Sequence, residues 1–294
     1  MNYYDEIKKE LLNNEITKKV KNYSINKSDL NTYYNIGKLL KEAGKHYGEG
    51  IIKEYSKRLT SEFGKGYSKR NLWLMLKFYE LKEKVQTVSA QLSWSHYCEL
   101  LQVNSIDKIN YYIKITKEQN LSIRELRAKI KNNEYERLDE STKEKLKEKE
   151  ELKVPDLVKN PIQIKNTSGN NEISEKVLQK LILEDIPSFL DELGNGFTFV
   201  RNEYKIKIGD RYNYIDLLLF NYEFNCFVVV ELKVTELRKE HIGQIEFYMN
   251  YIDKNLKNIN QNKTIGIIIC KKENRYVIEY CSDDRILARE YELI

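Results

Sequence analysis

The sequence predicts an α+β protein, with an all-helical N-terminal domain followed by a domain that runs helix, three strands, helix, strand. Two patterns support this fold class. Apolar residues recur at helical spacing throughout residues 1–138, whereas two β-branched and aromatic runs of strand length flank residue 223. A charged stretch containing two prolines separates these patterns. We therefore expect domains at residues 1–138 and 171–294, joined by a charged connecting helix and linker at 139–170.

The composition points to a soluble protein of the cytoplasm. Charged residues make up 32% of the 294 residues, while Pro (3) and Gly (12) are scarce, as is typical of helix-rich chains. No apolar run approaches the length of a membrane span, and we expect no signal peptide. The four cysteines form no C-x-x-C pair, which favours reduced thiols. The three histidines are too scattered to indicate a zinc site or a Ser-His-Asp triad.

The net charge of +5 is unevenly distributed along the chain. Residues 1–170 hold 33 Lys and Arg against 24 Asp and Glu, a net charge of +9, whereas residues 171–294 hold 17 against 21, a net charge of −4. A basic first part favours an interpretation in which it supplies most of the affinity for nucleic acid. The alternative is that Lys-rich helices reflect a Lys-rich composition and nothing more.

Periodic apolar residues predict a series of helices in the N-terminal half, over residues 3–23, 28–45 and 48–63 and from residues 67, 92 and 121 onward. Ser122 and Glu125 have the spacing of a capping box, in which each side chain satisfies a backbone N–H at the helix start.

The helix that opens near Ser68 carries Lys69 and Arg70 in its first turn. Cations at this end run against the helix dipole, so we expect them to serve another purpose. A helix, a short Gly-containing turn and a second helix with basic residues at its start resemble a helix-turn-helix reader of DNA. A plain turn in a helical bundle is the alternative.

The C-terminal half predicts regular elements in a definite order. They are a helix over 172–193, a strand or strand pair over 197–208, a hairpin of strands at 214–220 and 226–232, a helix around 244, and a buried strand at 264–270 followed by the segment 275–280.

Folding the hairpin symmetrically about its turn, residues 221–225, places Asp216 opposite Glu231. Paired residues of an antiparallel ladder point to the same face, and Lys233 shares that face because strand side chains alternate. Two carboxylates and an ammonium would thus converge on an otherwise apolar surface.

Burying two like charges together is costly unless a cation neutralises them, and hard oxygen ligands suit Mg²⁺. Such a metal polarises a phosphoryl oxygen and lowers the pKa of a bound water, which is the chemistry of phosphodiester hydrolysis. The alternative is a structural salt bridge at a strand end. The tripeptide Glu-Leu-Lys is weak evidence alone, because residues 80–82 and 151–153 repeat it in helical sequence.

Asp216, fourteen residues and then Glu231-Leu-Lys233 resemble the PD-(D/E)XK nuclease superfamily. Gln244 and Tyr248 resemble the Gln-x-x-x-Tyr element of RecB-like nucleases, and their i, i+4 spacing places both on one helix face. An ordinary amphipathic helix is the alternative for this pair alone.

Longer blocks resemble one family within that superfamily. NLWLMLKFYE and LSWSHYCELL in the first half, and GDRYNYIDLLLFN, VVVELK and GQIEFYMNYID in the second, are similar to the YhcG family in the order of that family. The resemblance implies a helical DNA-binding domain fused to an αβββαβ, restriction-endonuclease-like nuclease domain. It also implies a prokaryotic protein linked with defence or mobile elements.

Two positions depart from the pattern that the resemblance implies. Glu175 stands at the first of the Glu pair usual in the first helix, but Gln179 stands at the second. The Arg-Gln of the family appears as Asn202-Glu203, with Arg201 one position early. If the Glu absent at 179 contacts metal or DNA, activity would be altered or lost.

These observations predict a cytoplasmic, Mg²⁺-dependent (or Mn²⁺-dependent) DNA endonuclease. The expected site residues are Asp216 and Glu231 for the metal and for catalysis, Lys233 to orient and activate water, Gln244 and Tyr248 to position the scissile strand, Glu175 as a secondary candidate, and Lys69 and Arg70 for nucleic-acid binding. A single nuclease core cuts one strand per visit, so a homodimer is compatible with duplex breaks. The alternatives are a DNA-binding protein whose nuclease-like domain is inactive, and an RNA-cleaving nuclease.

Overall fold

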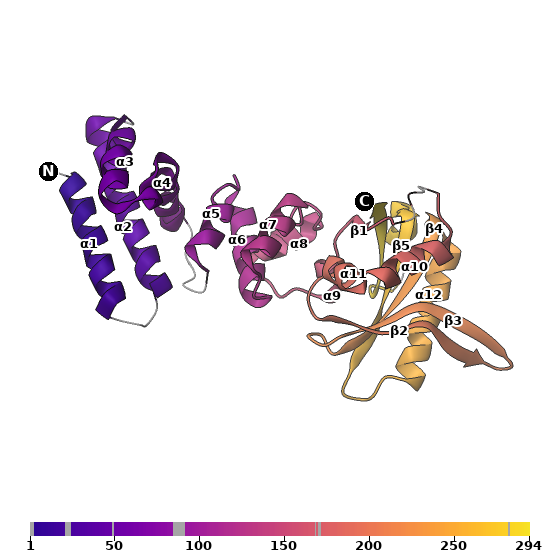
Figure 1. Cartoon of the computed structure of the whole chain (residues 1–294). Helices are drawn as coiled ribbons and strands as arrows, with labels where there is room; N and C mark the ends of the chain where they lie inside the picture. Colours follow the sequence, from indigo (N-terminus) through magenta and orange to yellow (C-terminus); the bar gives the residue numbers. More distant parts are fainter. Residues whose placement is uncertain are drawn as a thin grey trace. The chain divides into compact units, whose positions relative to one another are not determined.

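The computed structural model describes residues 3–20, 25–48, 50–84, 92–167, 169, 172–281 and 283–294. The chain divides into two compact units, Met1–Tyr135 and Glu136–Ile294, each with its own core (Figure 1). In the parts of the chain that the structure covers, no helix combines the length and apolar character that crossing a membrane requires.

The first unit is helical wherever the structure describes it, as the sequence predicts. Its elements are α1 (Tyr3–Val20), α2 (Ile25–Tyr47), α3 (Gly50–Phe63), the 3₁₀ turn η1 (Lys65–Tyr67), α4 (Lys69–Lys84), α5 (Trp94–Leu100), α6 (Ile106–Glu118) and α7 (Ile123–Lys131). The expected end of the first helix falls on residues 21–23, which lie outside the described residues.

Close packing of α2 on α4 depends on a glycine. A Cβ atom at Gly37 would lie 2.2 Å from the carbonyl oxygen of Met75, so a larger residue would force the two helices apart. The starts of two other helices follow the expected side-chain chemistry. Ser122 and Glu125 form the capping box at α7, and the Ser68 hydroxyl accepts a bond from the Asn71 backbone N–H at the start of α4.

The second unit is built on a six-stranded mixed sheet of order β1-β6-β5-β4-β3-β2. The strands are β1 (Ile162–Ile164), β2 (Phe197–Ile208), β3 (Arg211–Asn221), β4 (Cys226–Glu236), β5 (Asn262–Lys272) and β6 (Ile286–Leu293). The helices are α8 (Glu140–Glu148), α9 (Val154–Leu157), α10 (Glu175–Glu184), α11 (Ile186–Leu193), α12 (Lys239–Asn255) and α13 (Arg275–Glu279). The pairs β2–β3 and β3–β4 are antiparallel, whereas the pairs β4–β5, β5–β6 and β6–β1 are parallel.

Side chains alternate along each strand, so the two faces of the sheet pack into different hydrophobic cores. Leu217, Val228 and Val230 pack with α10 and α11, whereas Leu218 and Val229 pack with α12. The order helix, three strands, helix, strand expected for an αβββαβ core is therefore confirmed.

The segment 139–170 differs from the expected connecting helix and linker. Only residues 140–148 of its charged run form a helix, and the segment lies within the second unit. Apolar residues explain the difference: Val154, Val158, Ile162 and Ile164 are buried in the nuclease core, and β1 pairs with β6. The expected boundary at 170/171 falls partly on residues 168, 170 and 171, outside the described residues.

Two further elements differ from the sequence expectation. The helix expected over 172–193 is divided into α10 and α11 at Asp185, whose side chain accepts the Ser188 N–H and caps the second helix just before Pro187. Strand β6 lies beyond the last strand that the sequence indicated, and residues 275–279 form the short helix α13.

Candidate active site

The hairpin of β3 and β4 has the register that symmetric folding predicts. The paired rungs run from Asn221–Cys226 at the turn to Leu217–Val230, and the next rung of that register is Asp216–Glu231. Backbone pairing stops before that rung. Instead, the Asp216 carboxylate accepts a hydrogen bond of 2.8 Å from the Leu232 backbone N–H, which joins the two strands through a side chain.

Glu231 is the most deeply buried acid of this site, with 3% of its surface exposed. One carboxylate oxygen accepts a hydrogen bond of 2.8 Å from the Lys233 ammonium. The other, Oε2, is buried and has no hydrogen-bond partner among the described residues. Lys233 also lies 3.8 Å from a Glu175 oxygen, so three acids surround one ammonium.

Burial raises the pKa values of both strand carboxyls, and the charges of neighbouring acids raise them further. Burial raises the pKa of Asp216, and burial together with the Asp216 charge raises the pKa of Glu231 to about 7. Burial alone would lower the pKa of Lys233, but its bond to Glu231 and the surrounding acids outweigh burial and raise it. The cluster thus carries more negative charge than its ammonium neutralises.

The donor set fits a hard divalent cation. Asp216 and Glu231 offer carboxylate oxygens, and the unpartnered Oε2 of Glu231 is an acceptor that a cation would satisfy. No group of three or more His, Cys, Asp or Glu side chains is poised to hold a metal within the described residues. Two carboxylates suffice for Mg²⁺, because this ion keeps several water ligands and takes others from substrate phosphates.

Helix α12 contributes the polar pair Gln244 and Tyr248. The Gln244 amide donates to the Tyr248 hydroxyl at 3.2 Å, as side chains one helical turn apart can. Burial raises the pKa of Tyr248, and the charges of Glu231 and Asp216 raise it further, which places the ring within electrostatic reach of the acids.

Helix α10 also contributes two side chains, Gln179 and Glu175, next to the cluster. Gln179 donates its amide to the Asp216 backbone carbonyl at 3.1 Å. This residue therefore holds the backbone of the acid and is not itself a carboxylate ligand. Glu175 lies one turn earlier on α10 and approaches Lys233.

Two residues near the site were not among the predicted site residues. Glu203 of β2 lies between rungs Asn202–Leu217 and Tyr204–Ile215, so it faces Asp216, and it has a φ of 45° inside a strand. Folding the first hairpin about Gly209-Asp210 would have found it. His241 of α12 has its pKa lowered by burial and by the Lys233 charge, and only the fold brings it there.

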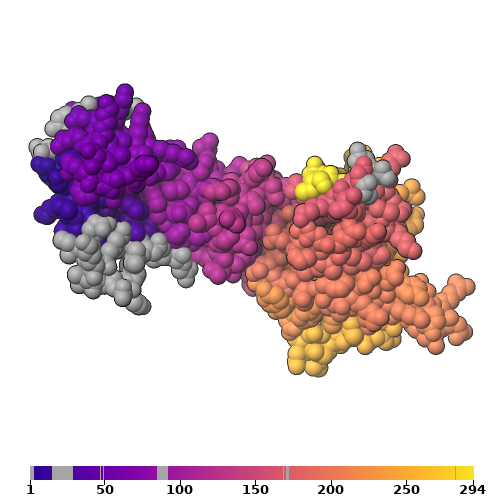
Figure 2. Space-filling model, in the orientation of Figure 1, coloured from indigo at the N-terminus to yellow at the C-terminus, as the bar shows by residue number. Residues whose placement is uncertain are grey.

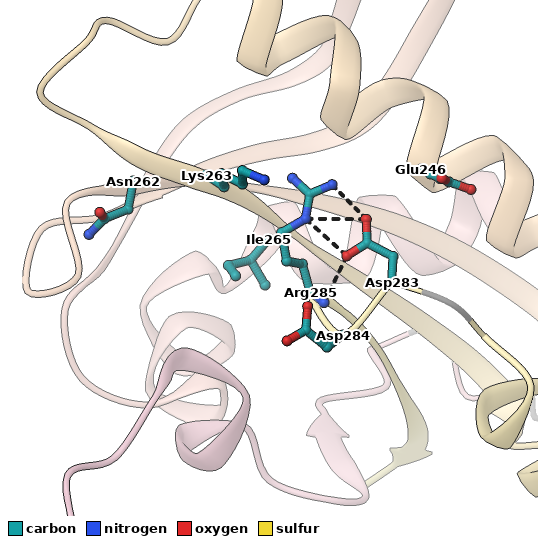
Figure 3. Close-up of a pocket in the computed structure, with 7 residues that line it drawn as sticks. All are labelled: Glu246, Asn262, Lys263, Ile265, Asp283, Asp284 and Arg285. Atoms are coloured by element: carbon teal, nitrogen blue, oxygen red, sulfur yellow. Dashed lines mark hydrogen bonds and ion pairs between the residues drawn. The ribbon is translucent and has the colours of Figure 1, made fainter.

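Lys69 and Arg70 are exposed in the first turn of α4, in the other unit, and do not belong to this cluster. A separate surface pocket is lined by Glu246, Asn262, Lys263, Ile265, Asp283, Asp284 and Arg285 (Figure 3). Its guanidinium is held by Asp283 and Asp253, and it contains none of the expected site residues.

Comparison with known proteins finds a separate family match for each half of the chain. Residues 155–294 match the family described as YhcG PDDEXK nuclease domain, and residues 7–137 match the DUF1016 N-terminal domain. The Escherichia coli (strain K12) protein named "Putative nuclease YhcG" is 26% identical over 317 residues, covering 92% of this chain and 84% of that protein.

Solved structures show more distant similarity. A structure of an EndoMS complex with double-stranded DNA is 18% identical over 44% of this chain and 49% of that chain, with a TM-score of 0.33. A repair endonuclease from Pyrococcus abyssi is also 18% identical, over 43% and 49% of the two chains, with a TM-score of 0.29. The chain spans about half the length of each. With the αβββαβ core already established, residues 155–294 are identified as a YhcG PDDEXK nuclease domain, and residues 7–137 as a DUF1016 N-terminal domain.

Proposed function

We propose that this protein is a divalent-cation-dependent nuclease that hydrolyses phosphodiester bonds of DNA, with Mg²⁺ or Mn²⁺ held by Asp216 and Glu231. The observation that carries the proposal is the buried Glu231 oxygen without a partner, next to a second carboxylate and an ammonium. A purely structural salt bridge would not need a second acid whose charge raises the pKa of the first.

Each neighbouring side chain has a role that its chemistry supports. Bound Mg²⁺ would supply polarisation of the phosphoryl oxygen and a water of lowered pKa. Lys233 stays protonated, since its pKa is raised, and its ammonium donates to the attacking water or to a phosphate oxygen. Gln244 and Tyr248 offer an amide and a hydroxyl on one face of α12 for positioning the scissile strand. Glu175 serves as a further acid beside Lys233.

Affinity for DNA would come in large part from the first unit. Residues 1–135 hold 25 Lys and Arg against 16 Asp and Glu, a net charge of +9, and Lys69 and Arg70 are exposed at the start of α4. Cations placed there bind phosphates by releasing counterions, so binding should weaken steeply with salt.

Cleavage of four substrates tests the proposal: duplex, branched and single-stranded DNA, and RNA, each with Mg²⁺, with Mn²⁺ and with EDTA. The variants are Lys233→Ala and Asp216→Asn, with Lys254→Ala as a matched control because Lys254 is exposed at the C-terminal end of α12. We expect metal-dependent cleavage of DNA that both site variants abolish. The control variant should cleave DNA as the wild type does, and the spectra of all variants should be those of the folded protein.

The other outcomes separate the alternatives. Salt-sensitive DNA binding without turnover in either metal would assign the chain to the inactive, DNA-binding class. Cleavage of RNA alone would reassign the substrate. Cleavage that survives both site substitutions would refute the proposed site.

A further inference from the structure

The hairpin of β2 and β3 extends past the point where β3 leaves β4. Residues 211–215 of β3 pair with β2 alone, because the β3–β4 ladder ends at Leu217. The resulting two-stranded ribbon, residues 204–215, is called here the arm. It projects from the sheet in Figure 1 and protrudes at the right-hand side of the surface in Figure 2.

The two faces of the arm differ in composition. One face carries Tyr204, Ile206, Ile208 and Ile215, which pack towards α12. The opposite face is formed by two paired rungs, Lys205–Tyr214 and Lys207–Tyr212, and all four of its side chains are exposed. Tyr212 and Tyr214 keep 51% and 52% of their surface in contact with solvent. We call these four side chains the open face.

A direct contact confirms that the open face is continuous. The Lys205 ammonium lies 3.7 Å from the centre of the Tyr212 ring, diagonally across the two rungs. In the described part of the chain, neither Lys205 nor Lys207 forms an ion pair. Asp210 lies at the tip of the arm and Glu203 directly precedes its base, so neither acid stands between the lysines.

The open face leads to the cluster of acids. Asp216 follows Tyr214 by two residues on the same strand, a distance of about 7 Å along β3. Ammonium groups bind phosphates, and exposed rings stack on bases whatever their sequence. Rings can stack only on bases that are free of a duplex partner, so this pairing of residue types favours an unpaired strand over a duplex.

We propose that the open face of the arm binds a single, unpaired DNA strand and delivers it to Asp216. This inference rests on the nuclease function proposed above and gives it a substrate class: DNA with a single-stranded segment beside the scissile bond. Bases stack on Tyr212 and Tyr214, while Lys205 and Lys207 contact the phosphates between them.

Photo-crosslinking of the full-length protein locates the strand without requiring turnover. A single-stranded oligonucleotide carrying 5-iododeoxyuridine is irradiated with the protein in EDTA, and adducts are mapped by mass spectrometry. We expect adducts at Tyr212 or Tyr214. Adducts only at exposed rings elsewhere, such as Tyr222, Tyr276 or Tyr280, overturn the proposal, and so does the absence of any adduct. Equal labelling of the arm by a blunt duplex overturns its assignment to a single strand.

A cleavage comparison supplies the second readout. The double variant Tyr212→Ala/Tyr214→Ala is expected to lose about 10- to 100-fold in cleavage of single-stranded DNA at sub-saturating substrate, from the stacking of one base. Tyr222→Ala is the matched control, since Tyr222 is 62% exposed in the turn at the opposite end of β3. A double variant as active as this control overturns the proposal. All three rings are exposed enough for the fold to tolerate their removal, which melting curves check.

The two proposals fail separately. If the arm forms adducts but the protein cleaves nothing with Mg²⁺ or Mn²⁺, the proposed binding of a single strand by the arm stands and the proposed nuclease function fails. Metal-dependent cleavage with no adducts on the arm and no effect of the double substitution would do the reverse.

Discussion

The Asp216 carboxylate on β3 accepts a hydrogen bond of 2.8 Å from the backbone N–H of Leu232 on β4. Leu232 stands between Glu231 and Lys233, so this bond holds the acid of one strand beside the acid and the ammonium of the next. It forms where the backbone ladder has ended at Leu217–Val230. The side chain thus keeps the two acids close together where the backbone no longer pairs the strands.

Glu231→Gln should change how stability depends on pH in the metal-free protein. Because burial raises the folded-state pKa of Glu231 to about 7, its contribution to stability is present at low pH and is lost as pH rises through about 7. We expect the free energy of unfolding of the variant to exceed that of the wild type at pH 8 by on the order of 1–3 kcal/mol, and to be close to it at pH 4. Glu144→Gln, an exposed carboxyl on α8, is the control. Parallel melting profiles for wild type and Glu231→Gln would contradict the account.

Gln179→Leu should loosen Asp216 without removing a charge. The substitution deletes the hydrogen bond of 3.1 Å to the Asp216 carbonyl, at a cost of about 1 kcal/mol. We expect weaker Mn²⁺ binding as well as a lower melting temperature, since the acid that binds the ion is less well positioned. Lys180→Leu, the exposed neighbour on α10, checks for a general effect on the helix. A loss of stability with unchanged Mn²⁺ affinity would limit Gln179 to a structural role.

Tyr248→Phe removes a hydroxyl and leaves the buried ring in place. Its Gln244 partner is then free to turn away, and the strand loses one donor, so we expect about a 10-fold loss of cleavage rate with the melting temperature nearly unchanged. Tyr251→Phe on the same helix is the matched control. Equal activity of the two variants would show that the Tyr248 hydroxyl takes no part in the reaction.

Arg137→Ala tests whether residues 136–170 are part of the nuclease unit. The guanidinium makes a two-pronged ion pair with Glu192 on α11 and donates to the Pro161 carbonyl just before β1. Leaving Glu192 buried without its partner should cost about 3–5 kcal/mol, read from urea unfolding of the full chain. Arg124→Ala, exposed on α7, should have little effect. If both variants unfold alike, residues 136–170 act as a linker after all.

The sequence predicts the central geometry of the site because register follows from two local facts. The turn at 221–225 and the two-residue period of strands place Asp216 opposite Glu231, and a slip of one residue would send Val229 to solvent. The i, i+4 spacing of Gln244 and Tyr248 is equally local, and so it is equally predictable.

Features that depend on distant partners were not predictable in this way. Strand β1 has three residues, directly after Pro161, and becomes a strand only because β6 offers an edge 129 positions away. Gln179 shows its role only once α10 is docked near β3, where its amide meets the Asp216 carbonyl. The pairing of the first hairpin is a local feature that was left open, although folding it about Gly209-Asp210 gives the rungs of the open face.

Titration of the metal-free protein with Mn²⁺, followed by electron paramagnetic resonance, tests the central claim most directly. If Asp216 and Glu231 hold a divalent cation together, the wild type binds Mn²⁺ in competition with Mg²⁺, and Asp216→Asn binds it at least 10-fold more weakly while remaining folded, as roughly expected when a charged ligand is lost. Equal binding by the wild type and Asp216→Asn, or none by the wild type at millimolar Mn²⁺, would contradict the account.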